Sequence, residues 1–105
     1  MQWTLIVSED DGFQRRALAC MPDRSYVVGA TGDGSARQIV GALNVATVLV
    51  DARDDAGRKF LGSLAGLPSS RLPRILAVGL ARASTRFERH GTVTSAVRAG
   101  LAGAA

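Results

Sequence analysis

The chain has 105 residues, a length that suits one domain with a single hydrophobic core. Hydrophobic residues make up 47% of it and charged residues 21%, which are globular averages and argue against a disordered chain. One cysteine and one histidine exclude an internal disulfide and a zinc-type site. The apolar runs are strand-sized, which excludes a membrane span, and acids follow the first run too closely for a secretory signal, so we expect a cytoplasmic protein.

The net charge is +4, and twelve of the thirteen basic residues are Arg. A basic chain suggests nucleic acid as a partner. However, the arginines are spread along the chain, and no aromatic residues alternate with them to form a base-stacking platform. We therefore do not expect nucleic acid to be the main partner.

Strand-like and helix-like segments alternate in the first part of the chain. Trp3–Val7 is a short apolar run typical of a strand, and apolar residues at helical spacing from Phe13 to Met21 predict a helix. Residues 25–30 predict a second strand, followed by a glycine-rich turn. Ser35 is expected to cap the next helix.

The alternation continues after residue 45. Residues 46–50 are apolar except for Thr47, as expected of a strand covered on both faces, and Asp51 follows directly. Apolar residues between positions 60 and 64 predict a third helix, and Arg74–Val78 predicts a fourth buried strand. Such alternation predicts one α/β domain over residues 1–105, a three-layer fold with a doubly wound, mostly parallel sheet.

The end of the chain is less regular. Residues 86–89 suggest a short fifth strand, and Thr92 or Thr94 would cap a last helix. Only residues 80–85 separate this segment from the fourth strand, whereas a parallel crossover takes a dozen residues or more. We expect the fold to be truncated or rearranged here, so that either the fourth helix or the fifth strand is missing.

Acidic residues gather around the ends of the first and third strands, which are neighbours in the usual winding order. Close carboxylates repel one another, so such a cluster favours a divalent cation, and magnesium is the cation expected for carboxylates plus phosphate. The alternative is helix capping, because carboxylates at helix starts gain about 0.3–1 kcal/mol from unpaired amides. Capping explains Asp10, Asp11, Asp54 and Asp55, but it does not explain Asp51, which ends a buried strand.

Three segments together resemble the receiver domains of bacterial response regulators. Residues 4–13 are similar to the family's first strand and its acids, residues 26–36 to its second strand and Asp-Gly turn, and residues 47–51 to its phosphoacceptor strand. The resemblance implies the flavodoxin-like fold of receivers. It also implies that Asp51 stands where a receiver takes a phosphoryl group from a histidine kinase.

The chain departs from the receiver pattern at four places. Ser8 stands where the family has its first metal-binding acid, and residues 52–57 replace the usual Met-Pro turn. Gly79 follows the fourth strand where the family has Thr or Ser, and Arg89 and His90 stand near the place of its Lys. Receivers transmit their signal through the face that the shortened connection alters.

These departures favour a pseudo-receiver, a module for phosphorylation-independent protein–protein interaction in bacterial signal transduction, with no enzymatic activity and no cofactor. The alternative is a phosphorylatable receiver in which Asp51 is the nucleophile, Glu9, Asp10 and Asp51 hold magnesium, Arg89 contacts the phosphoryl oxygens, and a histidine kinase is the partner. A second alternative is an unrelated small α/β regulatory domain of a larger protein. The sheet edge left exposed by a missing helix makes a homodimer a further expectation.

Overall fold

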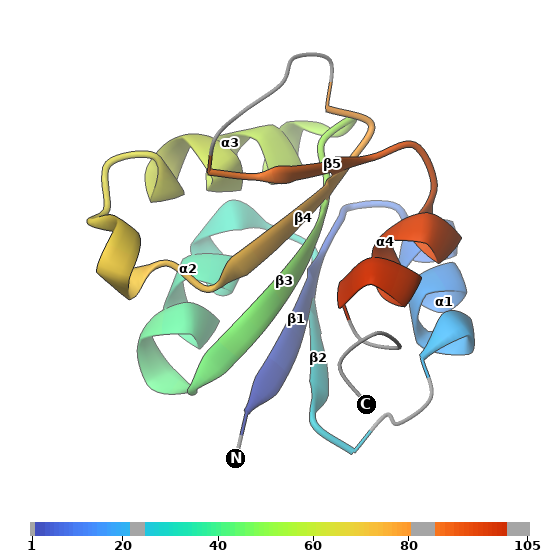
Figure 1. The fold of residues 1–105 in the computed structure, drawn as a ribbon, viewed down its shortest axis with the longest axis horizontal. Coiled ribbons are helices and arrows are strands. Elements are labelled where there is room, and N and C mark those ends of the chain that lie inside the picture. Colours follow the sequence, from blue (N-terminus) through green and yellow to red (C-terminus); the bar gives the residue numbers. More distant parts are fainter. Residues whose placement is uncertain (1, 22–24, 81–85, 101–105) are drawn as a thin grey trace.

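The computed structural model describes residues 2–21, 25–80 and 86–100. Figure 1 shows a central twisted sheet with helices on both sides. Along the chain the elements are β1 (Trp3–Val7), α1 (Asp11–Cys20), β2 (Val27–Ala30), α2 (Asp33–Ala42), β3 (Val45–Asp51), α3 (Asp55–Leu64), the 3₁₀ turn η1 (Ser69–Arg71), β4 (Arg74–Val78), β5 (Glu88–His90) and α4 (Val93–Gly100). The strands are all parallel, in the order β2-β1-β3-β4-β5. The predicted three-layer, doubly wound α/β fold is confirmed.

Two separate cores cover the two faces of the sheet. The helices α1 and α4 lie together on one face, and α2 and α3 lie on the other. Successive side chains of a strand point to opposite faces. Leu5 and Val7 therefore join Phe60 in the core on the α2–α3 face, whereas Ile6 joins Phe13 on the α1–α4 face, and all five side chains are fully buried. No helix in the described ranges has the length and apolar character of a membrane span.

Aspartates cap two of the helices, as the capping interpretation predicted. Asp10 is the N-cap of α1 and Asp54 the N-cap of α3, and each accepts a hydrogen bond from a backbone N–H of the first turn. The expected cap at Ser35 is wrong, because α2 begins earlier. Gly32 occupies the N-cap position with extended backbone, and Asp33 places its carboxylate in the first turn, where the helix dipole stabilises it.

The fifth strand is present, although it begins two residues later and ends one residue later than predicted. β5 pairs in parallel with β4 from Glu88 to His90. Of the connection between the two strands, residues 79–80 and 86–87 form no helix, and residues 81–85 lie outside the described part of the chain. Thr92, rather than Thr94, caps α4, because its Oγ1 accepts a hydrogen bond of 3.1 Å from the Ser95 N–H.

One ion pair joins the two strands at this edge and predicts a small pH dependence of stability. Arg74 of β4 donates from Nε and Nη2 to the Glu88 carboxylate, and this hydrogen bonding lowers the pKa of Glu88 below its ordinary value. A lowered folded-state pKa stabilises the fold above the unfolded-state pKa, and this contribution disappears as the pH falls through the folded-state value. Both side chains are 43% exposed, so we expect the contribution at pH 7 to stay below about 1 kcal/mol.

The comparison of the wild-type protein with Glu88→Gln measures this contribution. In urea titrations at pH 7 the variant should be slightly less stable, and the difference should shrink as the pH falls below the ordinary range of a glutamate. A difference that persists unchanged at pH 3 would show that the charge of Glu88 is not its cause.

Candidate functional site

The carboxyl ends of β1 and β3 bring Ser8 and Asp51 together. The two strands are neighbours, and their register pairs Val7 with Val50, so the next residue of each strand lies at the same edge of the sheet. Ser8 is fully buried and Asp51 is 3% exposed. The Ser8 Oγ lies 3.0 Å from Asp51 Oδ2, which it reaches as a hydrogen-bond donor.

The Ser8 hydroxyl also contacts a second carboxylate, that of Asp54. Its Oγ lies 3.0 Å from Asp54 Oδ2, so two carboxylates share one hydroxyl proton. The same oxygen accepts a hydrogen bond of 3.0 Å from the Asp10 backbone N–H. Ser8 therefore connects the end of β1 with the end of β3 and the start of α1.

Arg53 donates hydrogen bonds to the other carboxylate oxygen of Asp51. Its backbone N–H and its Nε donate to Asp51 Oδ1 at 3.1 and 3.3 Å. Both carboxylate oxygens thus have hydrogen-bond partners from the same chain, and the guanidinium offsets the carboxylate charge at a distance typical of an ion pair. The Arg53 side chain is 56% exposed, so water weakens this attraction.

Gly79 makes room for this arrangement at the end of β4. It has a φ of +82°, in the left-handed region that glycine adopts easily. A Cβ at this position would lie 2.5 Å from Arg53 Cγ. The stem of Arg53 therefore lies next to the point where the receiver resemblance places the side chain of Thr or Ser.

Asp54, the N-cap of α3, connects the two loops that meet at the site. Its Oδ1 accepts a hydrogen bond of 2.7 Å from the Gly57 N–H, which caps the helix, and its Oδ2 accepts one of 2.7 Å from the Glu9 N–H. The first bond is local, whereas the second joins the loop after β1 to a residue 45 positions away in sequence. Asp54 is thus a structural partner of both loops at this edge of the sheet.

Glu9 and Asp10, which were predicted to hold magnesium together with Asp51, make other contacts in the structure. Glu9 is exposed and contributes its backbone N–H to the site. The Asp10 carboxylate accepts from the Gly12 N–H at 2.9 Å, with its other oxygen 4.0 Å from Arg16. Among the residues that the structure describes, no three His, Cys, Asp or Glu side chains form a group that could hold a metal ion.

Arg89, predicted to contact a phosphoryl group, lies on the short edge strand β5. It is exposed, and its Nε donates to the Leu80 carbonyl at 3.2 Å. The guanidinium that contacts Asp51 is instead that of Arg53. β3 and β5 are separated in the sheet by β4, which explains why the residue two positions after Asp51 reaches it more readily.

Sequence reasoning missed Arg53 and the second role of Asp54. Asp54 was interpreted as a helix cap, which is correct, but its bond to Glu9 depends on how two distant loops meet. A signal for Arg53 was present in the sequence, because a long side chain follows closely after Asp51 and the fourth predicted strand is followed by Gly79, which has no side chain to fill the same space. Comparison of the chain with protein-family models, curated proteins and solved structures gave no match.

Proposed function

We propose that this chain is a receiver-like domain that works as a phosphorylation-independent protein-interaction module in bacterial signalling. The observation that carries the proposal is that the Asp51 carboxylate is buried and already hydrogen-bonded. Its two carboxylate oxygens accept hydrogen bonds from Ser8 and Arg53, and the residue is 3% exposed. A carboxylate nucleophile needs one free oxygen in line with its phosphodonor, so at least one of these two partners would have to move before Asp51 could react.

The contacts of Asp51 within the chain already connect the strand ends that a phosphoryl group would connect in a phosphorylated receiver. In this chain Arg53 and Ser8 link the ends of β1, β3 and β4 without an added group. A site connected in this way fixes one arrangement of the surrounding loops. This supports a domain whose binding surface forms without phosphorylation.

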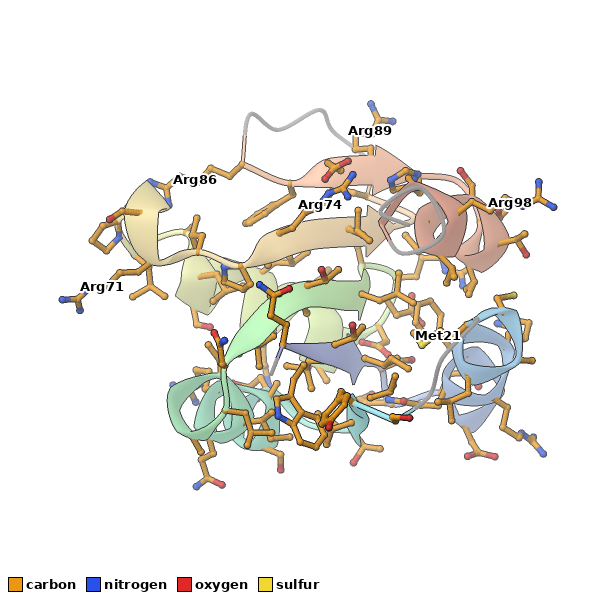
Figure 2. The ribbon with its side chains drawn as sticks, turned by 60° about the horizontal axis from the view of Figure 1, so that its bottom comes forward. Met21, Arg71, Arg74, Arg86, Arg89 and Arg98 are labelled. Carbon is orange, nitrogen blue, oxygen red and sulfur yellow. The ribbon has the colours of Figure 1, made fainter. Side chains whose placement is uncertain are left out.

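The charge distribution favours the β4–β5–α4 side as the interaction surface. From residue 66 onward the sequence contains six arginines and one acid, whereas the first 65 residues hold seven basic and eight acidic residues. Figure 2 shows arginines on η1, on β4, just before β5, on β5 and on α4: Arg71, Arg74, Arg86, Arg89 and Arg98. Because Arg is common in protein interfaces and opposite potentials speed encounter, this side suits a protein with an acidic surface.

The test of the phosphorylation-independent role is incubation of the whole chain with magnesium and acetyl phosphate, followed by intact-mass measurement. We expect no phosphoryl increment in the wild-type protein or in Asp51→Asn. An increment in the wild-type protein that disappears in Asp51→Asn would overturn the proposal and favour the phosphorylatable receiver.

The binding surface is tested with variants on its two sides. A partner isolated by crosslinking should bind the wild-type protein and Asp51→Asn equally, and should bind the double variant Arg71→Glu/Arg89→Glu less tightly. Arg15→Glu/Arg37→Glu, on the exposed faces of α1 and α2, is the control with the same change in charge. Equal losses in both double variants would contradict the assignment of this side.

A further inference from the structure

A cavity of about 390 Å³ opens between α1 and the start of α4, beside the carboxyl end of β4. Its volume lies in the range of sites for small molecules, about 300–1,000 Å³. Apolar side chains contribute to its walls, from Ala19 on α1, Val78 on β4 and Val93 on α4. The cavity therefore offers a compact apolar surface next to the Asp51 site.

The polar part of the lining is cationic. Arg16 of α1 and Arg53 of the β3–α3 loop line the cavity, and no described residue of its lining is acidic. Both guanidinium groups have other contacts, with Asp10 at 4.0 Å and Asp51 at 3.3 Å. The Arg16–Asp10 pair joins two exposed side chains and is weak, and the Arg53 side chain is itself more than half exposed, so a ligand can reach both guanidinium groups.

Uncharged donors complete the lining. Thr92 and Thr94 bring hydroxyl groups. The N–H groups of Val93 and Thr94 belong to the first turn of α4, before the first intrahelical acceptor is available. Donors of this kind, next to two guanidinium groups, complement a group that carries several acceptor oxygens.

We propose that this cavity binds a small organic anion, with an oxyanion group on Arg16 and Arg53 and a compact apolar body against Val78 and Val93. Because Arg53 also contacts Asp51, the ligand draws the same guanidinium away from the carboxylate. The receiver-like site then responds to a ligand rather than to a phosphodonor. Binding itself does not depend on the proposed interaction role, so either can fail without the other.

The experiment is a titration of the ¹⁵N-labelled full chain with phenyl phosphate, followed by NMR. We expect saturable shifts concentrated at residues 16–20 and 91–94 and at the Arg53 Nε–H. Arg16→Gln and Arg53→Gln should each weaken binding about tenfold, as expected for the loss of a charged hydrogen bond. Arg37→Gln, on the far face of the sheet, is the matched control and should bind as tightly as the wild-type protein.

Three comparisons decide the chemistry of the ligand. Benzoate should shift the same residues, inorganic phosphate should bind more weakly because it lacks an apolar body, and benzyl alcohol should produce no saturable shift. Equal binding of benzyl alcohol and phenyl phosphate would overturn the anion assignment. Shifts scattered over many arginines, or an equal loss in Arg37→Gln, would overturn the cavity as the site. Arg16→Gln changes an exposed side chain outside the Asp51 contacts, so its loss of binding cannot arise from damage to them.

Discussion

Gly57→Ala should lower the free energy of unfolding by about 3 kcal/mol, at the upper end of the usual cost of overpacking. A Cβ at this position would lie 1.8 Å from the backbone oxygen of Asp51 and 3.0 Å from Asp54 Oδ1. The close atom belongs to the backbone of β3, so no side-chain rotation relieves the contact. Instead α3 must move away from the end of β3, which strains the cap that Asp54 provides.

Gly62→Ala is the matched control, because it makes the same substitution in the same helix. A Cβ at Gly62 meets nothing within 4 Å, and alanine favours a helix over glycine by up to about 1 kcal/mol. We therefore expect opposite signs for the two variants in urea denaturation. Equal effects would show that the approach of α3 to Asp51 is looser than its geometry indicates.

The order of the first elements could be predicted from the sequence because β1, β2, β3 and β4 are apolar runs separated by helical patterns. Val48, Leu49 and Val50 are all buried, since one face of β3 packs under α2 and α3 and the other under α1 and α4. Capping was less predictable, since several polar residues stand near each helix start. Ser35 has the chemistry of a cap, yet the backbone turns into α2 at Asp33.

The place of Asp51 could also be predicted, whereas its partners could not. A charged residue directly after a buried strand lies at the carboxyl edge of the sheet whatever the loops do. The position of Arg53 depends on the absence of a side chain at Gly79, and the bond from Glu9 to Asp54 depends on the meeting of two loops. The contact of Arg53 with Gly79 and the bond from Glu9 to Asp54 each link residues far apart in sequence, so the residues next to them do not predict these contacts.

Ser8→Asp is expected to cost the most stability, about 3–5 kcal/mol, the usual effect of an uncompensated buried charge. The substitution restores the acid that the receiver resemblance implies at this position. It also removes the hydroxyl that donates to Asp51 and Asp54 and adds a third carboxylate within reach of both. Since Ser8 is fully buried, water cannot reduce the repulsion, and Arg53 alone does not neutralise three charges.

Ser8→Asn has the same size as Ser8→Asp without the charge, so the difference between them in thermal unfolding isolates the repulsion. If three carboxylates reconstitute a receiver-type cation site, magnesium should raise the Tm of Ser8→Asp, because a ligand that binds only the folded state stabilises it. Ser8→Asn and the wild-type protein should not respond. A magnesium-dependent rise in the wild-type Tm would instead favour the phosphorylatable receiver. Equal stability of the two variants would mean that the hydroxyl of Ser8, rather than the absence of a charge, holds this site in its present form.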